Sequence, residues 1–302
     1  MGMRITSNMM SSQTVRNLNN NLLNMDKLSN QSSTGRKINK ASDDPVGTTY
    51  ALRYRAELAA NQQYTSNTDE AKSWLDYSDT VMGQAGDVMT RIKELTVQAG
   101  TGTTDSSGLT AVKDELEQLK GQLANIGNSQ LTGKYIFNGQ QLGEEPYTLS
   151  DTVTSLTDVV TDTGQVTYGI SENVSLGVST SGNDFFGSKA DTDNVFAMID
   201  RLTTAMNNND HAAISAELPN IESRATKMSA LRSEVGAKTN RIELIQSRLE
   251  DRDLNVSTLQ SKVEDADVAE TLIKATAAQT VYQAALKTSA SALQLSLVNF
   301  MG

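Results

Sequence analysis

The sequence contains no cysteine, and it has only one histidine and three prolines among its 302 residues. The lack of cysteine excludes disulfide bonds, thiolate nucleophiles and cysteine-ligated metals. A single histidine cannot supply the His-Glu-x-x-His motif of zinc peptidases. That histidine, His211, follows Asn207-Asn-Asn-Asp210 and is interpreted as a surface loop residue.

Aromatic residues are also scarce, at 5%, and hydrophobic residues of all kinds make up 37% of the chain. This composition suits long, thin helical bundles better than a thick globular core. No stretch approaches the roughly 20 consecutive apolar residues of a membrane-spanning helix. The opening residues 1–10 lack the apolar core of a cleavable signal peptide. We therefore expect neither a membrane anchor nor signal cleavage.

The net charge of −10 comes mostly from one middle segment. Residues 144–193 hold nine acidic residues and one basic residue, Lys189, whereas residues 1–143 hold 14 of each sign. A segment with so much like charge is expected to face water, away from packed subunits. Because no basic patch with interleaved aromatic residues is present, nucleic acid is not an expected partner.

Both ends of the chain carry apolar residues spaced alternately three and four apart. The N-terminal series contains Val15, Leu18, Leu22 and Met25, and Ser11, Ser29 and Ser32 continue its register. The C-terminal series runs through Val268, Leu272, Ala275, Gln279, Tyr282, Leu286, Ser289, Leu293, Ser296 and Phe300. Such spacing keeps one face of a helix against a partner helix. Each end is therefore expected to pair with the other end, with further copies of the chain, or with both.

The same spacing continues inside both halves of the chain. It runs from Asn67 to Ala99 and, after a turn-rich loop, from Leu109 to Ile126. These two tracts predict a helical hairpin, with Trp74 in its core. Helical spacing returns from Val195 to Met206 and again from Val235 to Val263. Asp265 and Asp267 are expected to cap a further helix, because Glu270 stands three residues after Asp267.

Between the helical halves, charged helix formers give way to Thr, Ser, Val, Gly and Asp. Residues 166–170 and 174–178 alternate apolar with polar or small residues, as β-strands do. We therefore predict a mainly α protein with a β-rich insert. Its N- and C-terminal halves form an elongated antiparallel helical bundle or coiled coil, and a small β domain points outward.

This organisation predicts three kinds of domain. Residues 1–45 and 268–302 form terminal coiled-coil arms, residues 46–143 and 194–267 form a helical rod, and residues 144–193 form the acidic outer insert. Residues 1–60 carry a net charge of +4 and residues 250–302 a net charge of −3, so the ends attract each other. Apolar residues are too sparse in one arm to offset the cost of ordering its backbone. We therefore expect the arms to be disordered in the free monomer.

Several motifs resemble those of one protein family. Ser32-Ser-Thr-Gly-Arg-Lys-Ile-Asn-Lys-Ala-Ser-Asp-Asp-Pro-Val-Gly47 resembles the N-terminal signature of bacterial flagellins and their relatives, and Met3-Arg-Ile-Thr-Ser-Asn8 resembles the family's opening. Val235-Gly-Ala-Lys-Thr-Asn-Arg241, Val263-Glu-Asp-Ala-Asp-Val-Ala269 and Tyr282-Gln-Ala-Ala-Leu286 are similar to its C-terminal half. The resemblance covers residues 3–140 and 195–301. On it, Arg36, Asn39, Asp43, Asp44, Pro45, Asn240, Arg241, Asp265 and Asp267 are identified as family-motif residues.

Three details look more like the hook-associated protein 3 branch of this family than like filament flagellin. They are Pro45, the segment Gly133-Lys-Tyr-Ile-Phe-Asn-Gly139 and the ending Leu297-Val-Asn-Phe-Met301. The resemblance implies a structural role in the bacterial flagellum: a ring of copies that joins the hook-associated protein 1 layer to the flagellin filament. It also implies unfolded export through the flagellar type III channel with the help of an export chaperone, and a secreted, extracellular location.

The family implies that the terminal arms pair on assembly. The expected assembly interface consists of Val15, Leu18, Leu22, Met25, Leu272, Tyr282, Leu286, Leu293, Leu297 and Phe300. No cofactor, metal or catalytic residue is expected.

Three alternatives remain beside this interpretation. The chain could be filament flagellin itself, or a soluble coiled-coil adaptor with no flagellar role. It could also be a hydrolase that uses the carboxylates Asp43, Asp44, Asp265 and Asp267, although turn formation and helix capping are favoured for these residues. A cation at Asp43 and Asp44 is disfavoured for the same reason.

Overall fold

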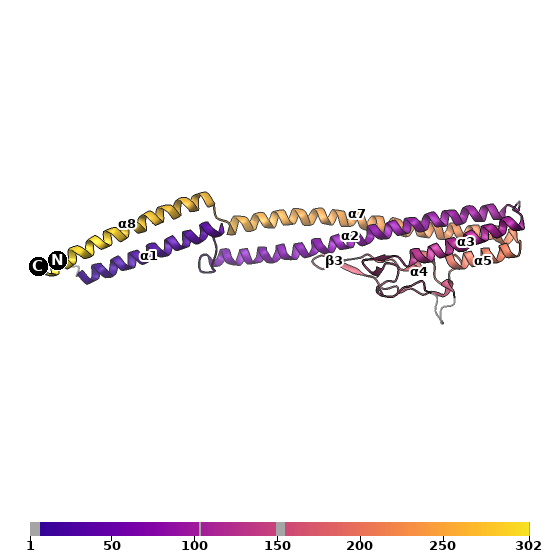
Figure 1. Cartoon of the computed structure of the whole chain (residues 1–302), viewed down its shortest axis with the longest axis horizontal. Helices are drawn as coiled ribbons and strands as arrows, with labels where there is room; N and C mark the ends of the chain where they lie inside the picture. The colour runs from indigo at the N-terminus through magenta and orange to yellow at the C-terminus, as the bar shows by residue number, and fades with distance from the viewer. Residues whose placement is uncertain (1–6, 103, 149–154, 302) are drawn as a thin grey trace. The chain divides into compact units, whose positions relative to one another are not determined.

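A computed structural model describes residues 7–102, 104–148 and 155–301 of the chain (Figure 1). The chain forms two compact units. The first, here called the terminal unit, contains Met1–Ala60 and Asp251–Gly302, and the central unit contains Asn61–Glu250. Two long helices, α2 (Pro45–Gly100) and α7 (Leu218–Glu264), contribute to both units.

The predicted fold class is confirmed. Most described residues are helical, and the β structure consists of two antiparallel two-stranded sheets. One sheet pairs β1 (Gln130–Leu131) with β2 (Lys134–Tyr135), and the other pairs β3 (Thr167–Ser171) with β4 (Val174–Gly177).

Capping residues define where the helices begin. Asp44 precedes Pro45, the first residue of α2, and its Oδ1 accepts a hydrogen bond of 2.9 Å from the Gly47 N–H. Helix α8 (Val268–Met301) begins in the same way, with Asp267 Oδ1 3.1 Å from the Glu270 N–H. These bonds satisfy amides that have no partner inside the helix. The predicted capping role of Asp267 and the turn role of Asp44 are therefore confirmed. Asp265, expected to cap the same helix, instead lies in a backbone bridge with Arg36.

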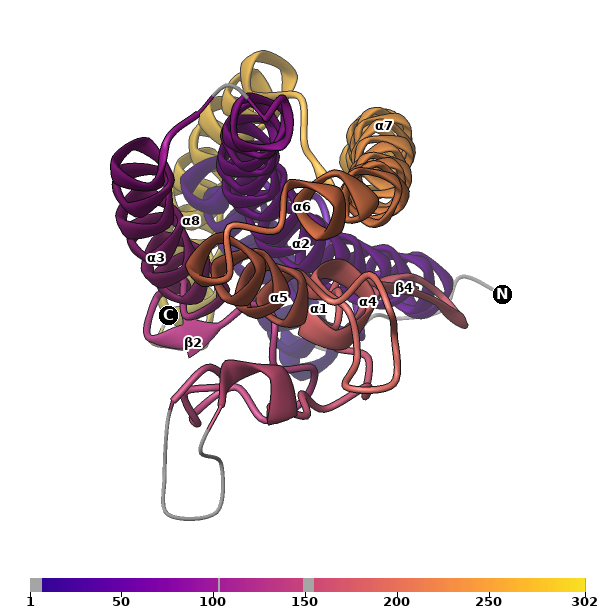
Figure 2. The ribbon, with the colours of Figure 1, turned by 90° about the vertical axis from the view of Figure 1, so that its right-hand side faces the viewer.

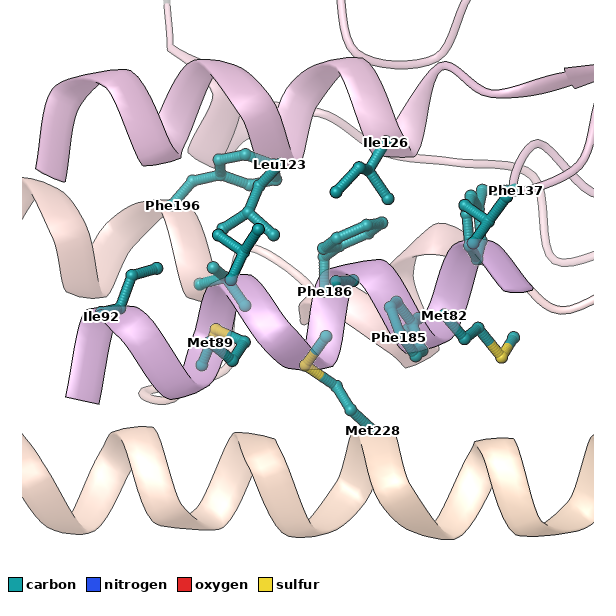
Figure 3. Close-up of a cluster of buried hydrophobic side chains, with 14 of the residues drawn as sticks. Met82, Met89, Ile92, Leu123, Ile126, Phe137, Phe185, Phe186, Phe196 and Met228 are labelled. Atoms are coloured by element: carbon teal, nitrogen blue, oxygen red, sulfur yellow. The ribbon is translucent and has the colours of Figure 1, made fainter. Parts of the chain in front are cut away.

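The core of the central unit lies between α2, α3 (Ser106–Gly127), α5 (Val195–Asn207) and α7 (Figure 3). Helices α2 and α3 form the predicted hairpin, with Arg91 Nε 2.8 Å from Glu115 Oε1. The seam predicted from the spacing is buried almost throughout. On α2 and α3 it comprises Ala71, Trp74, Ser78, Val81, Ala85, Val88, Ile92, Leu95, Ala99, Leu109, Val112, Leu116, Leu123 and Ile126.

The insert shares this core with the helices. Phe137 and the two residues Phe185 and Phe186 of the short helix α4 (Gly182–Phe186) pack with ring centroids 5.0–5.4 Å apart. Phe186 in turn contacts Phe196 of α5, at a centroid distance of 5.9 Å. The two predicted strands are present, but the insert also contains α4 and a 3₁₀ turn at Leu156–Asp158, which alternation alone does not reveal.

Helix α6 (His211–Ala216) corrects the interpretation of His211 as a surface loop residue. His211 is half-buried at the start of α6, and its Nδ1 lies 2.7 Å from the carbonyl oxygen of Ala99. The Ser215 hydroxyl donates to the Gly100 carbonyl at 3.3 Å. Helix α6 thus satisfies carbonyls at the C-terminal end of α2, and Figure 2 shows it beside α5. The sequence pattern missed α6 because it has little more than one turn.

The terminal unit contains the antiparallel pair of α1 (Ser7–Thr34) and α8 (Figure 1). It also contains the first turns of α2 and the last turns of α7. Residues 35–44 connect α1 to α2, and residues 265–267 connect α7 to α8. We call these two connecting segments together the joint.

Candidate assembly interface

The faces of α1 and α8 that meet each other carry few large apolar side chains. Half-buried or buried positions recur three and four residues apart along both helices. They are Thr14, Leu18, Asn21, Met25, Leu28 and Ser32 on α1, and Thr271, Ala275, Ala278, Tyr282, Ala285 and Ser289 on α8. Most of these side chains are small or polar, so the two helices bury little apolar area against each other.

Several other large apolar side chains of α1 and α8 remain exposed after the two helices pair. On α1, Val15, Leu22 and Leu23 are exposed, and Leu23 retains 67% of its accessible surface. On α8 the exposed set comprises Val268, Leu272, Ile273, Val281 and Leu286. We call these eight residues the outer apolar face. Scattered exposed leucines are ordinary, but this number on two adjoining helices is typical of surfaces that contact other proteins.

The predicted interface residues divide between the two faces. Leu18, Met25 and Tyr282 lie on the inner face, where α1 meets α8. Val15, Leu22, Leu272 and Leu286 lie on the outer face. We call the buried and half-buried positions where α1 meets α8 the inner seam. Every second position of this seam belongs to the series predicted from the sequence, and each of the other positions lies one residue away from a predicted one. The side chains of Leu293, Leu297 and Phe300 lie outside the described residues.

A shallow groove of about 360 Å³ runs along one side of the α1–α8 pair. Its lining mixes amides with small and apolar side chains from both helices: Asn21, Asn24, Leu28, Lys274, Ala277, Ala278 and Val281. The lining includes no carboxylate, and its lysine, Lys274, pairs with Glu270 of the same helix, so the chemistry of the groove suits packing by another helix.

The two segments of the joint pair through their backbones. The Lys37 N–H donates to the Glu264 carbonyl at 2.7 Å, and the Ala266 N–H donates to the Gly35 carbonyl at 2.9 Å. Arg36 and Asp265 form an antiparallel bridge. Gly35 ends α1 with a φ of +68°, a conformation that glycine adopts without steric cost.

The Glu264 carboxylate is buried beneath this pairing, with 1% of the residue exposed. One oxygen, Oε1, accepts from Arg55 Nη2 and lies 3.3 Å from Arg36 Nε. The other, Oε2, is 3.2 Å from Arg55 Nε and 3.0 Å from Gln260 Nε2. Two nitrogens of Arg55 therefore bond to the two carboxylate oxygens, and this bidentate geometry makes arginine–carboxylate pairs strong. The sequence analysis missed this role of Glu264.

Other motif residues complete the first segment of the joint. Asp43 Oδ2 accepts from the backbone N–H groups of Asn39 and Lys40, at 3.2 and 3.0 Å. The bond from Lys40 is the main cause of a lowered pKa for Asp43, and Lys27 of α1 lies 3.6 Å away. The Asn39 side chain donates to the Arg36 carbonyl at 3.0 Å. Asn240 and Arg241 lie elsewhere, exposed on α7 in the central unit.

The four candidate carboxylates do not converge on one site. Asp44 and Asp267 cap different helices, Asp43 bonds amides of its own segment, and Asp265 belongs to the backbone bridge. Within the described ranges, no group of three or more histidine, aspartate or glutamate residues is placed to hold a metal ion. No described helix combines the length and the apolar character needed to cross a bilayer.

Comparison with known proteins identifies the family. Residues 5–142 match the bacterial flagellin N-terminal helical region, and residues 218–301 match the bacterial flagellin C-terminal helical region. The chain is 26% identical over 250 residues to the flagellin of Bacillus subtilis, with 80% of each chain covered. It is 24% identical to the flagellar hook-associated protein 3 of Escherichia coli, covering 80% of this chain and 81% of that protein.

The fold has close counterparts among solved structures. One is the flagellar junction protein FlgL from Legionella pneumophila, which superposes with a TM-score of 0.58 at 14% identity and covers 72% of this chain and 100% of that one. At that identity the likeness concerns the fold. The sequence motifs, the paired terminal helices and the two family matches agree. The chain belongs to the bacterial flagellin family, whose members are structural proteins of the flagellum.

Proposed function

We propose that this protein is a structural axial component of the flagellum, which self-assembles as a ring at the hook–filament junction. The ring joins the hook-associated protein 1 layer on one side to the flagellin filament on the other. Two kinds of similarity support this proposal: the chain aligns with hook-associated protein 3 over 80% of its length, and its fold resembles that of a flagellar junction protein.

The outer apolar face is the observation that carries the proposal. Val15 and Leu22 on α1 and Leu272 and Leu286 on α8 remain exposed after the two helices have paired. A chain secreted into water gains nothing from displaying these side chains unless further helices cover them. Neighbouring copies in a ring, and the layers above and below it, supply those helices.

The energetics favour ordering of the arms on assembly. Burying a leucine or valine side chain stabilises by roughly 1.5–3 kcal/mol. Fixing the backbone of one residue costs about 1–2 kcal/mol. The α1–α8 contact alone brings together mostly small and polar side chains, so it does not offset the ordering of two long helices. When neighbouring copies also bury the outer apolar face, the sum becomes favourable. The arms are therefore disordered in the free subunit and helical in the ring.

The remaining domains follow from the same proposal. Residues 46–143 and 194–267 form the rod that packs around the ring, and residues 144–193 face outward. The subunit is secreted unfolded through the flagellar export channel, delivered by an export chaperone, and acts outside the cell. The protein catalyses no reaction in this role, and its mechanism is the mechanical coupling of hook to filament.

Filament flagellin is the second candidate, favoured by the alignment with the Bacillus subtilis flagellin over 80% of both chains. The two candidates differ in how far a polymer of this subunit grows. A flagellin lengthens a seed without limit, whereas a junction protein stops after adding its own layer.

A deletion strain tests the proposal directly. If the protein forms the junction, cells that lack it are non-motile, carry bare hooks in electron micrographs and release flagellin into the medium. Complementation with the full chain restores filaments, and complementation with a chain lacking residues 268–302 does not. Cells that still carry attached filaments after the deletion would refute the junction role. Cells that produce no filament protein at all would identify the chain as the flagellin.

A further inference from the structure

We propose that Glu264 is the positioning residue that sets the register in which α1 and α8 pair. The structure shows a buried carboxylate at the only place, within the described residues, where both connecting segments meet. The inference concerns the single subunit and holds whether or not the subunit forms a ring.

The first step is geometric. Glu264 ends α7, and its carboxylate is held by Arg36, which follows α1, and by Arg55, which lies on α2. Its own backbone carbonyl accepts from the Lys37 N–H at 2.7 Å. One residue thus holds the segment after α1, the segment before α8 and the beginning of α2 together.

The second step concerns register. Because the joint holds Gly35 next to Ala266, the last turn of α1 and the first turn of α8 are aligned before the rest of the pair forms. The groove lining shows the alignment that results, since Asn24 of α1 and Ala278 of α8 line it together. Two helices that are already joined at one end close only a short loop when they pair next to that joint. The register that starts from the joint therefore has the lowest entropic cost.

The third step is that the inner seam itself specifies register weakly. Ala275, Ala278 and Ala285 lie on the face of α8 that meets α1, and they are the same size. Sliding α8 by one heptad replaces Ala278 with Ala285 opposite the same α1 residues. Tyr282 is the large side chain on this face of α8, and the small residues around it distinguish the two registers little, so a buried polar or charged contact can select one of them.

The burial of Glu264 explains why this contact is selective. The carboxylate is 2% exposed, whereas the side chains of Arg36 and Arg55 are 52% and 44% exposed. The arginines therefore reach the carboxylate from the surface. In any other register of α1 against α8 the carboxylate would lose Arg36, whereas Arg55 on α2 would stay in place, and a buried charge that loses a partner is unfavourable.

Cysteine cross-linking tests the register, because the chain has no cysteine of its own. The native-register reporter carries Asn24→Cys and Ala278→Cys, and the shifted reporter carries Asn24→Cys and Ala285→Cys. The two α8 positions are about 10 Å apart along a helix, which exceeds the reach of a disulfide. Both reporters are oxidised briefly in the purified full-length subunit, so that even transient pairing is trapped.

With Glu264 present, the native reporter is expected to cross-link about tenfold more than the shifted one. Glu264→Ala should bring the two yields to within about threefold of each other, and Glu264→Gln, which keeps the shape and loses the charge, should fall between. The matched control is Glu270→Ala, since Glu270 is exposed on α8 and pairs within its own helix with Lys274. This control should leave the ratio unchanged.

A second variant separates register from stability. Arg55→Leu combined with Glu264→Leu removes the ion pair and keeps apolar volume at the site, a change that buried ion pairs often tolerate without loss of stability. We expect its thermal midpoint to match that of the parent while its cross-linking ratio collapses. An unchanged ratio in Glu264→Ala or in the double variant would overturn the proposal, as would an equal loss in Glu270→Ala. Because the assay requires no assembly, its result is independent of the junction role.

Discussion

Arg224 and Asp193 form a buried ion pair in the central unit. Arg224 Nη2 lies 2.5 Å from Asp193 Oδ1, and the two side chains are 2% and 5% exposed. Arg224 also donates to the backbone carbonyls of Asp193 and Asp184, at 3.0 and 3.1 Å. Helix α7 thereby holds the end of the acidic insert against the helical core.

Removing this arginine should destabilise the central unit. Arg224→Met removes the arginine from the buried Asp193 carboxylate and leaves it with Lys227 and Ser223, and we expect a loss of about 3–5 kcal/mol in the free energy of unfolding. Urea unfolding followed by circular dichroism measures it. The matched control is Arg232→Met on the same helix, whose partner Asp79 is exposed. This control should lose less than about 1 kcal/mol, and equal losses in the two variants would contradict the account.

The same pair predicts how stability depends on pH. Burial alone would raise the pKa of Asp193, but hydrogen bonds from Lys227 and Ser223 and the pairing with Arg224 outweigh it and lower the pKa to about 2, from 3.8. Since the folded pKa is the lower one, the contribution is complete above about pH 5 and is lost as the pH falls toward 2. It amounts to about 2 kcal/mol.

The Asp193→Asn variant should therefore lose less free energy of unfolding than the parent as the pH falls below about 5. The free energy of unfolding of the parent should fall by about 2 kcal/mol more than that of the variant between pH 5 and pH 2. Urea titrations at several pH values give both curves. Parallel curves would show that Asp193 does not titrate with a lowered pKa in the folded state.

Two glycines on α3 should respond in opposite ways to alanine. A Cβ at Gly127 would lie 2.4 Å from the Tyr147 ring, whereas a Cβ at Gly121 would meet nothing within 4 Å. Gly127→Ala should cost about 1–3 kcal/mol through overpacking. Gly121→Ala should gain about 0.5–1 kcal/mol, because alanine loses less backbone entropy in a helix. Thermal unfolding compares the two variants, and the same sign for both would contradict the packing described for Tyr147.

The outer apolar face predicts variants that fail to assemble but still fold. Leu272→Glu and Val15→Glu alter side chains that are 55% and 56% exposed, so the thermal midpoint of the free subunit should stay within about 2 °C of the parent. Both should abolish filament attachment in a complemented deletion strain, because each copy would bury a charge in its contact with the next. Asn20→Glu, an exposed polar position on α1, is the control and should restore motility. Full motility with Leu272→Glu would contradict the proposed use of this face.

Sequence spacing predicted the central unit well because its seams are strongly apolar. Residues such as Ile92, Leu95 and Leu116 leave little choice about which face is buried, and all three are at most 2% exposed. In the arms the same spacing predicted helices but only half of the inner seam. Small or polar residues such as Ala278 and Asn21 face the partner there, and a pattern built on large apolar residues does not select them.

Long-range ion pairs were beyond sequence reasoning. Glu264 stands beside Asp265 and Asp267, and no local pattern distinguishes the buried carboxylate from its exposed neighbours. Its partner Arg55 lies 209 residues away. The same holds for Arg224, because the carbonyl and carboxylate groups that pair with it belong to the insert. Proximity in the fold, which local spacing does not encode, decides both roles.

Amide hydrogen exchange before and after assembly tests the central claim most directly. In the free subunit, residues 268–291 of α8 should exchange within seconds, while the amides around Ile92 and Leu116 in the central unit stay protected for hours. In assembled rings, α8 and α1 should gain protection of about a hundredfold or more, with little change in the central unit. Arms that are already protected in the isolated subunit, and that gain nothing on assembly, would contradict the account.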